Sequence, residues 1–130
     1  MKFKVFATRE GLVGKKTATG HLIIPNDLFV ALPAVRALRR WVNVYYKESM
    51  AIVPVLDVGP WNVRDNYWDR QCPIPWAEIG KRDSWLGGPP KNKAGIDLAD
   101  GVFYGLGLKD NDWVEWEFTR KPDNGIAIIV

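Results

Sequence analysis

Two segments of this 130-residue chain resemble each other, and this internal repeat restricts the fold more than any other feature. The first copy runs over residues 26–46 and the second over 96–118. Each copy has an Asp-Leu turn, a short helical stretch and a strand that begins with Trp-Val. Two such copies imply pseudo-symmetric halves around one core. We expect them to form a small closed barrel, because closure removes the exposed edges of an antiparallel sheet.

The rest of the chain predicts a mainly β protein. Alternating or continuous apolar patterns predict strands at 3–8, 41–46, 52–58, 113–118 and 125–130, the last of them buried. Helical patterns are short and cover only 33–40 and 99–106. The length suits one folding unit, so residues 1–130 are expected to form a single domain.

Composition excludes several classes of protein. Hydrophobic residues make up 47% and charged residues 25%, the usual balance of a soluble globular domain. No apolar run reaches the roughly 18 to 20 residues of a membrane span, and residues 1–10 do not predict a signal peptide. Nine Lys and Arg against four Asp and Glu in residues 1–60 make that part mildly basic, without the dense basic stripe of a nucleic-acid reader.

Metal ions, nucleotides and cysteine chemistry are not expected. The single cysteine, Cys72, cannot form an internal disulfide, and with one histidine it cannot complete a zinc site unless carboxylates join. Glycines do not form a phosphate-binding loop. We therefore predict no metal and no cofactor.

Residues 61–95 separate the two halves and follow no period. They contain four prolines, four glycines and four tryptophans. Structureless segments of this length are uncommon unless they are functional or disordered, and the aromatic content argues against disorder. We predict an ordered insertion over one end of the barrel.

Two aspartates are candidates for acid chemistry. Asp57 ends an apolar strand, and Asp97 lies between two apolar residues just after the insertion. Burial and a neighbouring carboxylate both raise the pKa of a carboxyl group, which keeps a general acid protonated near neutral pH. The alternative is structural, with Asp97 capping a short helix and Asp57 accepting from turn amides.

A polar segment near the N-terminus supplies further candidates. Thr17 and Thr19 lie two residues apart, so on an extended segment both hydroxyls face one side and can bind one ligand or carboxylate. His21 is the only histidine and is a candidate for ligand binding, although a histidine beside a glycine turn is more often a structural hydrogen-bonding group.

The order and spacing of several motifs resemble the double-psi β-barrel of the rare lipoprotein A, expansin and barwin group. The motifs are Thr17-Ala18-Thr19-Gly20, Val53-Pro54-Val55-Leu56-Asp57-Val58-Gly59-Pro60 and Gly95-Ile96-Asp97-Leu98-Ala99. The resemblance implies a six-stranded barrel with short helices and a groove for polysaccharide, in bacteria usually peptidoglycan. In this group the residues matching Thr17, Thr19, Asp57 and Asp97 line the groove.

The resemblance also implies a mechanism. In related lytic transglycosylases the residue matching Asp97 protonates the glycosidic oxygen and then deprotonates the 6-hydroxyl of the sugar, which leaves an anhydro product. Asp57 would position or tune it. The chain departs from rare lipoprotein A at His21 and Phe29, where that family has Glu and His, and by the insertion.

Aromatic residues at the start of the insertion are candidates for stacking on sugar rings. They are Trp61, Tyr67 and Trp68, with packing against the barrel end as the alternative. For Trp76 and Trp85 we expect packing in the core.

The predicted function is therefore binding or cleavage of polysaccharide, with peptidoglycan first. A non-catalytic carbohydrate-binding module is the alternative, and an intracellular or phage-borne barrel with another ligand is a third reading. The resemblance suggests the cell envelope or secretion, whereas this chain shows no signal peptide. The oligomeric state is left open.

Overall fold

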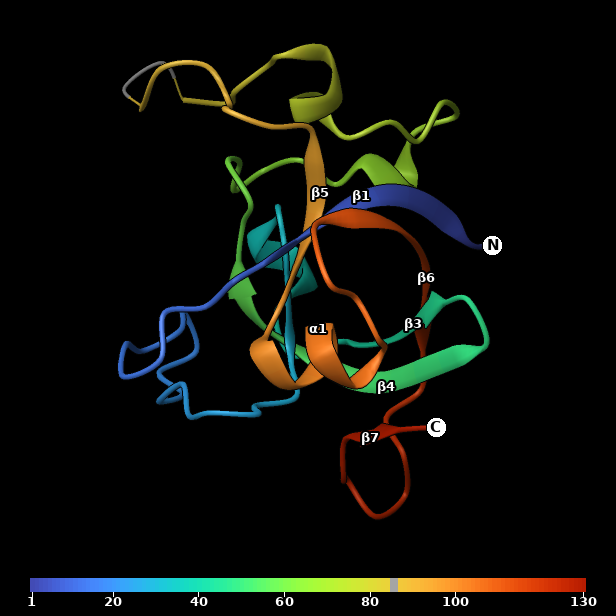
Figure 1. Ribbon diagram of the computed structural model, residues 1–130. Coiled ribbons are helices and arrows are strands. Elements are labelled where there is room, and N and C mark those ends of the chain that lie inside the picture. Colours follow the sequence, from blue (N-terminus) through green and yellow to red (C-terminus); the bar gives the residue numbers. More distant parts are fainter. Residues whose placement is uncertain (85–86) are drawn as a thin grey trace.

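Strands dominate the computed structural model, which describes residues 1–84 and 87–130 (Figure 1). The strands are β1 (Phe3–Arg9), β2 (Val30–Leu32), β3 (Trp41–Tyr46), β4 (Ser49–Val58), β5 (Ala94–Leu98), β6 (Asp112–Thr119) and β7 (Ile128–Ile129). The helical turns are η1 (Val35–Ala37), η2 (Tyr67–Asp69) and η3 (Trp76–Ile79), and the α-helix is α1 (Asp100–Gly105).

Six of these strands close into a barrel. Their order is β2-β5-β1-β6-β3-β4, and pairing of β2 with β4 closes the circle, while β7 adds to β4 from outside. Parallel pairs join β1 to β5 and β4 to β2, and antiparallel pairs join β1 to β6 and β4 to β3. Exchanging the first three strands with the next three preserves every pairing, so the two-fold relation that the repeat predicts is confirmed.

Alternation along the strands directs apolar side chains into the barrel. Val42 and Val44 of β3, and Val53 and Val55 of β4, are fully buried. Successive residues of a strand point to opposite faces, so the residues between them lie outside. Among the described residues, Trp116 of β6 is the largest fully buried side chain, and it fills the end of the barrel beneath the insertion.

The two copies of the repeat differ from prediction in detail. Each copy begins with a strand that the apolar patterns did not indicate, β2 or β5, because three to five residues are too short for a period to show. The helices expected over 33–40 and 99–106 are shorter in the structure, where they are η1 and α1. The predicted C-terminal strand 125–130 is wrong in length and burial: only β7 forms, and Ile126 and Val130 are exposed.

The insertion is ordered in its described residues and crosses one end of the barrel, above β1 and β5 in Figure 1. A clamp of hydrogen bonds joins the start of the insertion to its later residues. The Asn62 side chain is buried, accepts from the Asp83 N–H (2.7 Å) and donates to the Lys81 carbonyl (3.2 Å). No helix among residues 1–84 and 87–130 is long and apolar enough to cross a membrane.

Candidate functional site

Register places both predicted aspartates on one face of the barrel. Thr8 of β1 pairs with Asp97 of β5, Asp97 pairs with Ala31 of β2, and Ala31 pairs with Asp57 of β4. Directly paired residues point to the same side of a sheet. Neighbouring strands lie about 4.8 Å apart, so the backbones at Asp97 and Asp57 are about 10 Å apart, with the small Ala31 between them.

Asp97 is partly buried, and the electrostatics of its carboxyl group suit proton transfer. Burial raises its pKa to about 6, a hydrogen bond donated by the Thr8 hydroxyl opposes the rise, and the charge of Asp57 adds to it. Its second oxygen faces Gly59, where a Cβ atom would lie 3.7 Å away. A carboxyl group with this pKa is present in both protonation states near neutral pH, as an acid that later acts as a base requires.

Glu10 joins the two aspartates, although the sequence analysis missed it. It follows β1, and its N–H donates to the Leu98 carbonyl (2.8 Å). Burial raises the pKa of Glu10 to about 9, with further contributions from the charges of Asp57 and Asp97 and a hydrogen bond to Asp57. We call Glu10, Asp57 and Asp97 the carboxyl cluster.

The rule applied to the aspartates also finds Glu10. It is a carboxylate directly after a strand of alternating burial, followed by Gly11 at a positive φ of 64°. One of its oxygens, Oε2, is buried and has no hydrogen-bond partner among residues 1–84 and 87–130. Near pH 7 Glu10 is therefore a neutral acid that can donate a hydrogen bond.

Replacing Glu10 with glutamine is expected to stabilise the protein at neutral pH. The folded-state pKa of about 9 lies above the ordinary 4.5, so the contribution of Glu10 to stability is complete below pH 4.5 and is lost as the pH rises toward 9. Glutamine needs no proton. We expect the free energy of unfolding to rise by about 1 to 2 kcal/mol at pH 7, a value reduced for the part of Glu10 that water reaches.

Thermal unfolding of both proteins between pH 4 and pH 9 tests this expectation. The gain from Glu10→Gln should vanish near pH 4 and grow with pH. Glu115→Gln is the control, because Glu115 is exposed and its replacement should change stability by less than about 0.5 kcal/mol. A gain that is equal at every pH would contradict the role of the Glu10 proton.

The two predicted threonines lie beside Asp57. The Ala18 N–H donates to Asp57 Oδ1 (2.9 Å), and the Thr19 hydroxyl donates to the Leu56 carbonyl (2.9 Å). The Thr17 and Thr19 hydroxyl oxygens are 2.9 Å apart. The loop that contains both threonines therefore positions the Ala18 N–H to donate a hydrogen bond to the Asp57 carboxylate.

His21 is held by its own loop and not by the carboxyl cluster. Its Nε2 lies 2.6 Å from Asp27 Oδ2, and its ring packs edge-on against Phe29, with 5.7 Å between centroids. The Asp27 carboxylate also accepts from the Ile24 N–H (3.1 Å). These contacts are those of the structural alternative. A ligand role for His21 stays a prediction.

Trp61 is the predicted aromatic residue that the fold brings to Asp97. Both line a hollow of about 240 Å³, together with Thr8, Pro60 and Asn92. The indole N–H of Trp61 donates to Asn92 Oδ1 (2.9 Å), which also accepts from the Ala94 N–H (3.0 Å). This hydrogen bond orients the half-buried ring beside the carboxyl group. Sequence reasoning did not assign Thr8 and Asn92, which belong to no motif, or Pro60, which ends the Asp57 motif, to the site.

Tyr67 and Trp68 do not form a sugar platform, contrary to expectation. Tyr67 is completely buried and Trp68 is 8% exposed. The Tyr67 hydroxyl donates to the Gly95 carbonyl (2.8 Å) and accepts from the Trp116 indole N–H (2.8 Å). Because η2 folds back onto the end of the barrel, neither ring has a face free for a ligand.

The other two tryptophans of the insertion were expected in the core. Trp76 is only half-buried, with Arg70 and Lys81 at 5.2 and 4.8 Å from its ring. Trp85 lies outside the described residues. Among the residues that the structure describes, no group of three or more His, Cys, Asp and Glu side chains is arranged to hold a metal ion.

Comparison with known proteins identifies the fold. The model of a family described as "Domain of unknown function (DUF8814)" matches residues 1–117. No curated protein matches the sequence. The structure is similar to the Streptomyces papain inhibitor, with a TM-score of 0.56 and 18% identity over 92% of this chain and 96% of that one.

Two structures of an expansin from Clavibacter michiganensis are also similar. A mutant in complex with cellohexaose has a TM-score of 0.56 at 14% identity, and the apo protein has 0.55 at 16%. Each match covers 94% of this chain and 52% of the expansin, so this chain spans about half of the expansin's length. Together with the closed six-stranded barrel, these similarities confirm the predicted double-psi β-barrel.

Proposed function

We propose that this chain, which belongs to the family described as "Domain of unknown function (DUF8814)", binds a polysaccharide at the carboxyl cluster, with peptidoglycan first among the candidates. The observation that carries the proposal is the hollow of about 240 Å³ that places the Trp61 ring beside the Asp97 carboxyl group. An indole offers a flat apolar face to a sugar ring, and a carboxyl group binds its hydroxyls. Cellohexaose bound to the similar expansin supports the choice of ligand class.

Asp97 is the residue we assign to chemistry. With a pKa near 6 it can give its proton to the glycosidic oxygen as the bond from that oxygen to the anomeric carbon breaks. The resulting carboxylate then takes the proton of the sugar's 6-hydroxyl while that oxygen bonds to the anomeric carbon. The products are a shortened chain and an anhydro sugar, and no water or cofactor is consumed.

The other two carboxyl groups tune Asp97. The Asp57 charge raises its pKa, and the neutral Glu10 donates a hydrogen bond to Asp57 without adding a second full charge near pH 7. The Thr8 hydroxyl donates to one oxygen of Asp97, which leaves the other oxygen for the substrate.

We also propose that residues 1–130 form a single domain.

Incubation with purified peptidoglycan tests both activities. The wild type and Asp97→Asn are compared by mass spectrometry of the soluble products and by pelleting. Anhydro sugars from the wild type alone support cleavage with Asp97 as the acid. Pelleting of both proteins without products supports a binding module without chemistry. If neither occurs, peptidoglycan is not the ligand.

Trp61→Ala is expected to weaken binding of the polysaccharide about tenfold, because the sugar loses the apolar face beside Asp97. Pelleting at a series of protein concentrations measures the change. Tyr104→Ala is the control, since Tyr104 is 56% exposed and does not line the hollow. Equal affinities of Trp61→Ala and the wild type would remove Trp61 from the site.

Protein binding is a second candidate, favoured by one exposed loop. The loop after β1 has two strand-like arms that pair through Lys16 and Leu22. It exposes four aliphatic side chains by about half: Leu12, Val13, Leu22 and Ile24. The similar Streptomyces protein is a papain inhibitor. Inhibition of papain that Leu22→Asp abolishes would support this function, and full papain activity in excess protein would reject it for that protease.

A further inference from the structure

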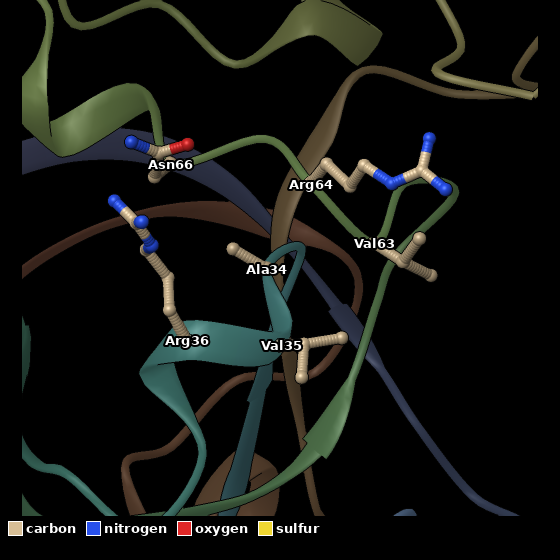
Figure 2. Close-up of a pocket in the computed structure, with 6 residues that line it drawn as sticks. All are labelled: Ala34, Val35, Arg36, Val63, Arg64 and Asn66. Carbon is tan, nitrogen blue, oxygen red and sulfur yellow. The ribbon is translucent and has the colours of Figure 1, made fainter.

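A second hollow opens beside the first, between η1 and the segment that follows β4. Its volume of about 620 Å³ lies within the range of small-ligand sites. Figure 2 draws the residues that line it: Ala34, Val35, Arg36, Val63, Arg64 and Asn66. The lining therefore contains two guanidinium groups and no carboxylate. Figure 2 shows them on either side of Ala34.

The backbone on both sides of this hollow is fixed by hydrogen bonds. The Val35 N–H donates to the Val63 carbonyl (2.9 Å), and Ala34 pairs with Arg64 in an isolated bridge. The Asp83 carboxylate accepts from the N–H groups of Val63 and Arg64 (2.7 and 2.6 Å). A ligand would meet a preformed backbone, which lowers the entropic cost of binding.

Within residues 1–84 and 87–130, neither the Arg36 nor the Arg64 guanidinium group is paired with an acidic side chain, although the Asp83 carboxylate accepts from the Arg64 backbone N–H. The adjacent acid, Asp65, is buried and already engaged, because it accepts from Arg70 (2.7 Å) and from the Trp76 N–H (2.7 Å). A guanidinium group binds a carboxylate through two parallel hydrogen bonds, so an anionic ligand suits this pair.

The hollow also has an apolar part. Val35 is 56% exposed and Val63 is 44% exposed, which leaves two aliphatic side chains available to the apolar face of a ligand. The hollow also adjoins the proposed sugar site, since Trp61 lines one and Arg64 the other. Three residues of chain span at most about 11 Å, so one extended ligand can reach both.

We propose that Arg36 and Arg64 form a carboxylate-binding subsite next to the sugar site, and that the polysaccharide bound by this protein carries carboxylate groups. This inference rests on the proposed function and specifies its substrate class. Asp97 opposes an acidic chain, but it lines the other hollow. Glu10, in the same carboxyl cluster, keeps its proton near pH 7 and adds no charge.

Isothermal titration calorimetry with two matched probes tests the subsite. The probes are cellohexaose and the β-1,4-linked hexamer of glucuronic acid, which replaces each hydroxymethyl group with a carboxylate. The wild type is expected to bind the acidic hexamer about tenfold more tightly, and Arg36→Gln/Arg64→Gln is expected to lose that preference. The acidic hexamer should also bind more weakly as salt is added.

The control removes two positive charges elsewhere. Lys109→Gln/Arg120→Gln changes two exposed cations outside both hollows and should keep the preference for the acidic hexamer within about threefold. Trp61→Ala should weaken both hexamers equally. Circular dichroism and thermal unfolding establish that each variant is folded.

The outcomes separate the two proposals. Equal binding of both hexamers, or a preference that survives in Arg36→Gln/Arg64→Gln, overturns the carboxylate subsite and leaves the sugar site standing. Binding of the acidic hexamer that depends on the arginines but not on Trp61 supports the subsite and rejects the sugar site. If neither hexamer binds, the carboxylate subsite is overturned, and the pelleting assay with peptidoglycan decides whether the sugar site stands.

Discussion

Trp116→Ala is expected to lower the free energy of unfolding by about 3 to 5 kcal/mol, the cost of truncating a large buried aromatic side chain. Trp116 is fully buried in β6, and its ring packs against Phe3, Tyr67 and Trp68 at centroid distances of 5.0, 6.0 and 5.6 Å. Alanine leaves a cavity there and removes the indole N–H that Tyr67 accepts. The midpoint of thermal unfolding should fall by about 10 to 20 °C.

Trp113→Ala on the same strand is the matched control. Trp113 is half-buried at the surface, where its ring contacts Phe6 and the ammonium group of Lys93. We expect a loss of about 1 kcal/mol. Calorimetry or chemical denaturation of the two variants measures the difference. Equal losses would contradict burial of Trp116 as the cause of its larger effect.

Gly101→Ala is expected to cost about 3 kcal/mol, because α1 lies against the backbone of the loop before β2. A Cβ atom on Gly101 would lie 2.2 Å from the Asn26 carbonyl oxygen and 2.5 Å from the Asp27 carbonyl oxygen. Neither atom belongs to a side chain that could turn away, so the helix or the loop must move. The displacement would also disturb Asp27, which holds His21.

Gly105→Ala tests the same exchange at the other end of α1. There the added Cβ would meet only the side chain of Ile129, at 3.1 Å, which can shift by a few tenths of an ångström. Alanine also favours helix over glycine by about 1 kcal/mol. Equilibrium denaturation should therefore find Gly105→Ala within about 1 kcal/mol of the wild type. Similar losses in both variants would show that crowding at Asn26 is not the cause.

Much of the barrel could be predicted because its strands carry local patterns. The ranges 3–8, 41–46 and 113–118 are predicted to within two residues of β1, β3 and β6. The repeat predicted the two-fold relation of the halves. The short strands β2 and β5 were not predicted. β2 has only three residues, and β5 follows the insertion without a hydrophobic period of its own.

The aromatic residues of the insertion could not be assigned from sequence. Tyr67 and Trp68 lie in the core, whereas Trp61 lines a hollow. All three are aromatic and lie within eight positions of one another in the sequence. Which ring is buried depends on how the insertion folds over β1 and β5. That path is set by contacts between distant residues such as the clamp from Asn62 to Asp83.

The sequence by itself predicted a closed barrel and two aspartates at its strand ends, because alternation, repeat and turn residues act over short distances. The double-psi form came from the resemblance of its motifs to a known group. Only the tertiary structure decided that Glu10 joins the two aspartates and that Arg36 and Arg64 line the same hollow. Glu10 is 47 residues from Asp57 and 87 from Asp97 along the chain, and closure of the barrel brings them together. Burial and charge then act through space, and no local pattern records them.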